Sequence, residues 1–384
     1  MDLIVSDEHV ELQETLGHLF AQKCPTSLVR RLRVDDGGDE LDGLWKSLSA
    51  GGFLGLGLPT EFGGGGGSLP DLGVLMHEAG RVVAPQIVKS TILFGLAVLR
   101  AGDDELRDRW LRRVCEEQIR AAVVLDYVTP GREDVVQVVP GPSGGWEIAG
   151  GVEFALLPAG WEVLLVSALT EDGQNRVLLV VDGSAPGLTC DRYQALGTRD
   201  LSKVTFDHVP VEAQDASTSR ADDEGVRGHM MWVADALAAL ESAEAVGGAE
   251  AVVDRTVAYI TDRVQFDRPI GSFQAAQHHI ANVSVAIEGA RLAALQALWL
   301  VDSASPVELG AALARAVAVS TFKQATLRAH QLHGGLGMTL ESDLHLWSER
   351  AKLLEVRGEL WDDFLERMAD TLDTEHDSTE RSRG

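Results

Sequence analysis

The segment Tyr259–Ala281, which reads YITDRVQFDRPIGSFQAAQHHIA, decides how the rest of the chain is arranged. Pro269 cannot lie inside a helix and restricts the backbone of the residue before it, whereas Gly271 adopts backbone angles that other residues avoid. The chain must therefore turn between Phe266 and Ser272. This turn predicts that one helix ends and another begins within the segment.

Apolar residues recur at helical spacing on both sides of the turn. They are Ala236, Leu237, Leu240, Ala243, Val246, Val252, Val253, Val257 and Ile260 upstream, and Ile280, Val283, Ile287, Leu292, Leu295 and Leu298 downstream. The spacing predicts two long helices joined by the turn. Such a pair presents Arg263, Gln265, Phe266 and Gln274 together at one end.

Two segments carry a resemblance to the acyl-CoA dehydrogenase family. The turn resembles the family's R-x-Q-F-G-x-P-I-x-x-F-Q-x-x-Q-H, with matches at Arg263, Gln265, Phe266, Pro269, Ile270, Phe273, Gln274, Gln277 and His278. A later segment resembles Q-x-x-G-G-x-G-(Y/F/M)-T-x-E, with matches at Gln331, Gly334, Gly335, Gly337, Met338, Thr339 and Glu341. The resemblance extends over nearly the whole chain.

Composition limits the class of protein. The chain has 384 residues, of which 45% are hydrophobic, and 33 basic against 59 acidic residues give a formal net charge of −26. This balance argues against nucleic acid or an anionic membrane as a partner, because both are bound through clustered Lys and Arg. Cys24, Cys115 and Cys190 lie far apart, as expected of structural thiols in a reducing compartment. The acidic N-terminus lacks the pattern of a signal peptide, and no apolar run predicts a transmembrane helix, so we expect a cytoplasmic protein.

Residues 1–119 predict an N-terminal helical domain. Ser6 is a plausible cap for the first helix, within residues 6–33, and further helices are expected at 45–52, 69–82, 86–101 and 104–117. The glycine run Gly63–Gly67 lacks the Gly-Lys-Ser/Thr ending and the preceding strand of a phosphate-binding loop. We therefore interpret it as a flexible loop.

Residues 120–220 alternate short apolar runs with turn clusters, which predicts an antiparallel β-sandwich or barrel. Residues 221–372 return to helical spacing, and 373–384 are a polar tail expected to be disordered. The predicted fold is mainly α with a central β-domain. The family resemblance implies the same order, with the C-terminal helices forming a four-helix bundle.

The resemblance also implies FAD as cofactor and an acyl-CoA as substrate. It implies that Arg263, Gln265, Phe266, Phe273, Gln274, Gln331, Gly334 and Gly335 contact the FAD pyrophosphate and adenine, partly across a subunit boundary. An arginine fork suits a pyrophosphate, and glycines allow close approach of the backbone. The alternative is that Arg263 pairs with a nearby acid and the glycines cap a helix. The adjacent His278 and His279 project in different directions from a helix, so no metal site is expected.

Several positions depart from the family pattern. Asp267 replaces a glycine, although aspartate tolerates a left-handed backbone. Residues 126–132 match only fragments of the family's flavin-binding segment, and its W-I-T becomes Phe154-Ala155-Leu156, in which Leu156 cannot donate a hydrogen bond to the flavin.

The base that removes the α-proton is also missing from both of its family positions, which correspond to Gly358 and Leu237. Glu359 is the candidate that a shift of one residue would supply. Glu355 also flanks the first position, whereas Glu241 and Glu244 follow the second on the same helix.

Three interpretations remain open for the function. The chain is the base-lacking partner subunit of a heteromeric acyl-CoA dehydrogenase, a self-sufficient homo-oligomeric FAD-dependent enzyme of lipid or steroid catabolism, or a binding module of the same fold. The helices at 236–301 and 307–332 are apolar over wide faces, and a single four-helix bundle cannot bury such helices on every side. We therefore expect association with a second copy or with a paralogous subunit.

Overall fold

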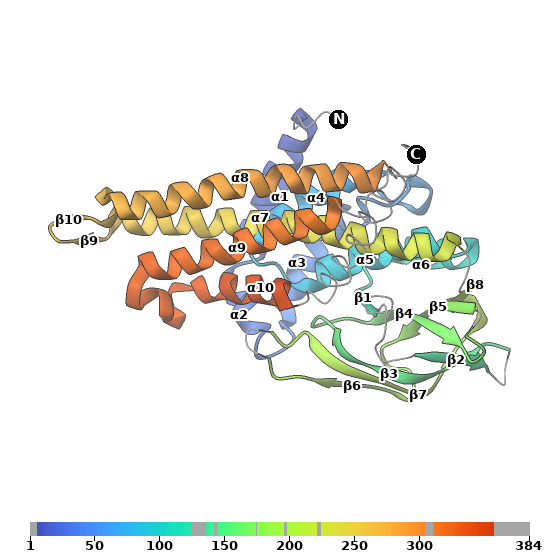
Figure 1. The fold of residues 1–384 in the computed structure, drawn as a ribbon. Coiled ribbons are helices and arrows are strands. Elements are labelled where there is room, and N and C mark those ends of the chain that lie inside the picture. The colour runs from blue at the N-terminus through green and yellow to red at the C-terminus, as the bar shows by residue number, and fades with distance from the viewer. Residues whose placement is uncertain are drawn as a thin grey trace, which may run out of the picture.

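The computed structural model describes residues 6–124, 136–141, 144–173, 175–195, 198–220, 224–303 and 310–356. Helices occupy the chain up to Glu116, strands follow from Ala121 to Arg220, and helices resume at Glu224. The sheet lies against one end of the helical layer (Figure 1). The mainly helical fold with a central sheet is as predicted, and the expected tail at 373–384 lies outside the described residues.

Six helices form the N-terminal part: α1 (Asp7–Lys23), α2 (Thr26–Arg31), α3 (Gly38–Ala50), α4 (Leu69–Arg81), α5 (Gln86–Ala101) and α6 (Asp104–Glu116). The Ser6 hydroxyl accepts a hydrogen bond from the His9 N–H, which confirms the predicted cap of α1. Pro25 divides the expected first helix into α1 and α2. Ser68 and Asp71 form a reciprocal capping box at the start of α4.

The glycine run Gly63–Gly67 is a closely packed loop and not a flexible one. Each of its five backbone N–H groups donates to a carbonyl oxygen between Gly55 and Thr60. A Cβ on Gly64 would lie 2.2 Å from the Leu58 carbonyl oxygen, so glycine is required there. Because all five donors are occupied, the loop cannot cradle a phosphate, as the missing motif predicted.

Eight strands build the sheet: β1 (Ala121–Val124), β2 (Gln137–Pro140), β3 (Trp146–Leu156), β4 (Val163–Thr170), β5 (Asn175–Asp182), β6 (Leu188–Arg192), β7 (Leu201–Val211) and β8 (Ala216–Arg220). Their order is β6-β7-β3-β2-β4-β5-β8, with β1 also on β4. The antiparallel prediction is incomplete, because β1 and β2 both pair parallel to β4. Turn signals indicate hairpins between successive strands, but they carry no information on a strand that pairs with one further along the chain.

The C-terminal bundle consists of α7 (Glu224–Asp262), α8 (Gln274–Asp302), α9 (Gly310–His333) and α10 (Leu344–Val356). Successive helices run in opposite directions, and the hairpin of β9 (Val264–Gln265) and β10 (Arg268–Pro269) projects beyond the bundle at the α7–α8 end (Figure 1). The predicted turn thus joins two long helices, as the spacing required.

The crossing of α4 and α7 is a contact between backbones. A Cβ on Gly80 would lie 2.0 Å from the Glu244 carbonyl oxygen, and one on Gly247 would lie 1.9 Å from the His77 carbonyl oxygen. Neither position tolerates a side chain. The two glycines therefore set how closely the N-terminal helices approach the bundle.

The outer face of α8 exposes several large apolar side chains in the single chain. Val285, Leu292 and Trp299 recur every seventh residue along it, and their exposed fractions are 75%, 47% and 38%. By length and composition, α8 is the one described helix that could cross a membrane, although core helices of soluble proteins pass the same test. Leu313 and Leu327 on α9 are also about half exposed.

Candidate functional site

The turn between β9 and β10 has the geometry of a two-residue hairpin turn. Phe266 and Asp267 have φ angles of 54° and 63°, and Gln265 pairs with Arg268 across them. Aspartate is among the few side chains that adopt this left-handed conformation at low cost. The turn therefore survives the replacement of the family's glycine by Asp267.

The two motif segments meet at the same end of the bundle. The ring of Tyr259, in the last turn of α7, stacks on that of His333 at the end of α9, with centroids 4.3 Å apart and an interplanar angle of 12°. Arg263 follows Tyr259 by one turn, and Gly334 follows His333 directly. This contact brings together segments that lie far apart in the sequence.

Most of the predicted cofactor residues are exposed at this end. Arg263, Gln265, Phe266, Gln274, Gln331, Gly334 and Gly335 face solvent, and Phe273 is half-buried. Within the part of the chain that the structure describes, the Arg263 guanidinium has no hydrogen-bond or ion-pair partner, so the alternative in which it pairs with a nearby acid finds no support. The donors lie on an outer surface, where they can reach a group held by another subunit.

The β-domain side fits a flavin poorly. Phe154 is 59% exposed, has a φ of 55° at a bulge in β3, and stacks on Tyr193 with centroids 4.9 Å apart. Leu156 presents no hydrogen-bond donor on its side chain. Residues 126–132, the other expected flavin segment, lie outside the described residues. The side chains present therefore fit FAD at the hairpin end but not at the Leu156 position.

In the sequence, neither of the two expected base positions, Leu237 and Gly358, carries a carboxylate. Leu237 is 7% exposed and packs with Leu93, Phe94 and Val233 in an apolar cluster between α5 and α7. Gly358 and Glu359 lie outside the described residues. Glu355 is bonded to Lys323 and Lys352, which hold its pKa below the ordinary value.

Glu241 and Glu244 belong to a buried ionic cluster that sequence reasoning did not find. Lys89 Nζ lies 3.0 Å from Glu241 Oε1 and 2.7 Å from Glu244 Oε2, while Arg315 and Arg350 bond the two carboxylates at 2.7 and 2.6 Å. Burial opposes ionisation of Glu244, but Lys89 and Arg350 outweigh it and hold its pKa below the usual value. A carboxylate held as an anion by two cations is a poor proton acceptor, so this cluster does not replace the base.

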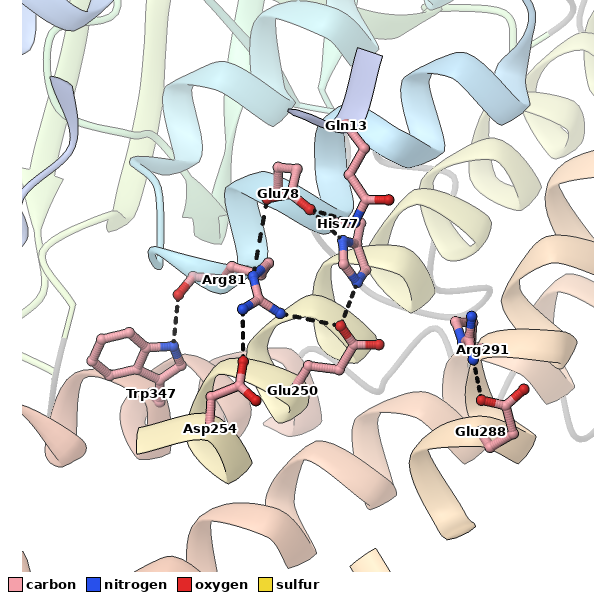
Figure 2. Close-up of polar contacts among 9 residues, drawn as sticks. All are labelled: Gln13, His77, Glu78, Arg81, Glu250, Asp254, Glu288, Arg291 and Trp347. Atoms are coloured by element: carbon pink, nitrogen blue, oxygen red, sulfur yellow. Dashed lines mark hydrogen bonds and ion pairs between the residues drawn. The ribbon is translucent and has the colours of Figure 1, made fainter. Parts of the chain in front are cut away.

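A second polar cluster joins α4 to α7 (Figure 2). His77 Nδ1 lies 2.9 Å from Glu78, and His77 Nε2 lies 3.0 Å from Glu250. Arg81 reaches both Glu250 and Asp254. Burial alone would lower the pKa of His77, but the two carboxylates raise it to about 9. A signal for this cluster was present in the sequence. His77, Glu78 and Arg81 lie close together on α4, and the acids Glu250 and Asp254 lie one turn apart on α7.

Metal binding has no candidate among the described residues. His278 and His279 lie on α8 without a third ligand, and the described part of the chain contains no group of three or more His, Cys, Asp or Glu side chains that could hold an ion.

Comparison with known proteins identifies the family. Residues 6–118 match the family description "Acyl-CoA dehydrogenase, N-terminal domain", and residues 229–358 match "Acyl-CoA dehydrogenase, C-terminal domain". Acyl-CoA dehydrogenase IpdE2 of Mycolicibacterium smegmatis is 31% identical over 350 residues, which cover 90% of this chain and 93% of that protein. A solved variant of the Tcur3481-Tcur3483 steroid ACAD is 29% identical with a TM-score of 0.82, covering 97% of this chain and 99% of that one. The ChsE4-ChsE5 complex from Mycobacterium tuberculosis, 23% identical with a TM-score of 0.84 over 97% and 99% of the two chains, shares the fold. The chain belongs to the acyl-CoA dehydrogenase family.

Proposed function

We propose that this chain is the base-lacking subunit of a heteromeric acyl-CoA dehydrogenase. A paralogous subunit carries the catalytic glutamate and binds the flavin ring. This chain supplies hydrogen-bond donors to the pyrophosphate and adenine of the same FAD. The observation that carries the proposal is the contrast between two sites. Leu237 occupies the described base position in an apolar cluster, whereas the Arg263 fork is exposed and unpartnered at the hairpin end among the residues that the structure describes.

The chain's own residues have binding roles in this proposal. When bound, FAD supplies the acceptor for a hydride from the β-carbon of the acyl group. Arg263 offers paired N–H donors to the pyrophosphate, and Gln274 and Gln331 add neutral hydrogen bonds. Gly334 and Gly335 leave room for the adenine edge, since a Cβ at either position would meet nothing within 4 Å and no side chain crowds the site.

The apolar faces of α8 and α9 supply the contact with the partner. Val285, Leu292 and Trp299 recur every seventh residue on the exposed side of α8, and contact with water makes such apolar side chains unfavourable in a single chain. Solved relatives with two named components, Tcur3481-Tcur3483 and ChsE4-ChsE5, support a heteromeric assembly.

The test compares the purified chain with the chain co-expressed with a glutamate-carrying paralogue. We expect the chain alone to have little of the visible absorbance of oxidised flavin and no oxidation of acyl-CoA thioesters with an artificial electron acceptor. The co-expressed complex should be yellow and active. Turnover by the chain alone would overturn the proposal and support the self-sufficient enzyme, and Glu359→Gln would then test the remaining base candidate.

We infer that the substrate of the complex is a CoA thioester whose acyl group is part of a steroid, because a relative at 29% identity is described as a steroid enzyme. A panel of straight-chain and steroid-side-chain thioesters at equal concentration tests this. Faster oxidation of the straight-chain thioesters would refute it.

A further inference from the structure

The glycine segment η6 (Gly334–Met338) is held near its far end by a histidine. His330 Nδ1, in the last turn of α9, lies 2.9 Å from the Gly337 carbonyl oxygen. A carbonyl oxygen only accepts hydrogen bonds, so Nδ1 carries a proton and donates it. This bond closes a loop that contains both cofactor glycines, Gly334 and Gly335.

The second nitrogen of the same ring is held by α10. His330 Nε2 lies 2.5 Å from Ser348 Oγ. With Nδ1 protonated in the neutral ring, Nε2 accepts a hydrogen bond from the Ser348 hydroxyl. One imidazole therefore joins the end of α9, the glycine segment and α10, and its two hydrogen bonds fix the orientation of the ring.

Gly337 has little room to move away from this contact. The residue is buried, and a Cβ there would lie 2.9 Å from His333 Cβ and 3.2 Å from the His330 carbonyl oxygen. A buried carbonyl nearly always has a hydrogen-bond donor, because leaving it unpaired forfeits its hydration without compensation. His330 supplies that donor for Gly337.

The two cofactor glycines lie between fixed points but remain open themselves. His333 stacks on Tyr259 directly before Gly334, and the anchored Gly337 follows Gly335 by two residues. A Cβ on Gly334 or Gly335 would meet nothing within 4 Å. A backbone that is anchored on both sides and uncovered between them is preorganised, because it loses little freedom when a ligand binds.

We propose that His330 is a positioning residue for FAD in the assembled complex. It does not contact the cofactor. By holding Gly337 against α10, it keeps the Gly334–Gly335 backbone in the place where the adenine edge binds. This inference rests on the proposed function, which assigns the adenine to these glycines. Loss of His330 weakens FAD binding because the segment must then be ordered when the cofactor binds.

Two substitutions of nearly equal size test the role of the Nδ1–H donor. His330→Asn keeps an N–H group near the position of Nδ1, whereas His330→Leu has no donor. The co-expressed complex is freed of flavin and titrated with FAD. We expect His330→Leu to raise the dissociation constant about threefold to tenfold, as the loss of one ordinary hydrogen bond does, and His330→Asn to restore most of the affinity. Ser348→Ala should act in the same direction as His330→Leu, and it decides the matter if that variant does not assemble.

Titration with FMN separates positioning from a general loss of structure, because FMN has the flavin ring but lacks the adenylate half of FAD. The His330→Leu complex should bind FMN as tightly as the wild type does. His18→Leu is the matched control, because His18 is exposed on α1 and should leave the affinity for FAD unchanged.

Unchanged FAD affinity in His330→Leu would overturn the proposal. An equal loss of affinity for FAD and FMN would also overturn it, since the histidine would then support the structure in general. Arg263→Ala identifies a failure of the proposed function. If Arg263→Ala weakens FAD binding and His330→Leu does not, only the role of His330 is wrong. If neither weakens it, the assignment of the cofactor segments is wrong as well.

Discussion

Raising the pH should remove the contribution of His77 to stability. Its pKa rises from the ordinary 6.5 to about 9 in the folded chain, because burial is outweighed by hydrogen bonds to Glu250 and Glu78. A raised folded-state pKa means that the stabilisation is complete below pH 6.5, declines above it and is lost once the pH passes 9. The difference between the two pKa values corresponds to a contribution of about 3 kcal/mol to the free energy of unfolding when the imidazole is protonated.

The assay is urea unfolding of the wild type and of His77→Gln near pH 6 and near pH 9.5. Groups that titrate in both proteins cancel, so the difference in stability isolates the imidazolium. We expect a difference of about 3 kcal/mol near pH 6 that shrinks towards zero near pH 9.5. His208→Gln is the control, because its partner Glu147 is also a carboxylate but His208 is 71% exposed. A difference for His77→Gln that stays constant with pH would show that the native imidazole is neutral and would refute the reasoning.

Substitutions at four further positions test the proposed assembly and the buried cluster. Arg263→Ala should lower the FAD content of the assembled complex after gel filtration by the loss of one or two charge-assisted hydrogen bonds of about 1.5–3 kcal/mol each, and Arg263→Lys should restore little. Asp267→Gly should raise FAD retention in the same assay, because it removes a carboxylate whose repulsion of a pyrophosphate is about 1 kcal/mol in water, and a fall would contradict this. Glu244→Gln should destabilise the chain by about 3–5 kcal/mol, because it leaves Lys89 and Arg350 with one carboxylate fewer. Lys89→Met should destabilise the chain less, because Glu241 and Glu244 each retain an arginine. Urea midpoints in the reverse order would refute that ranking.

The helices and the turn were predictable because their signals are local. Ser6 and Pro269 act on their own neighbours, and the apolar periods of α7 and α8 depend on one helix at a time. The break at Pro25 was not predicted, although its signal is local too. The parallel pairing of β1 and β2 with β4 was not predictable. Neither strand is followed directly by β4, and turn residues specify pairing only between successive strands.

Matching two motifs indicated which segments belong to the candidate site, but it gave no information on where charges meet across helices. Arg263 and Gly334 were expected at one place, and the stacking of Tyr259 on His333 is the contact that brings them there. The pairing of Lys89 with Glu241 joins α5 to α7, and nothing in either helix alone indicates it. Glutamates that the sequence offered as neighbours of a base position are counter-ions in the structure.

The glycine crossing of α4 and α7 explains how a chain of this fold can change its chemistry without changing its shape. Gly80 and Gly247 set the distance between the two helical layers through backbone atoms, and neither residue touches the hairpin end or the Leu237 cluster. Substitutions at the flavin and base positions therefore do not weaken this contact. A chain of this fold can therefore differ at those positions and still hold its two helical layers in the same arrangement.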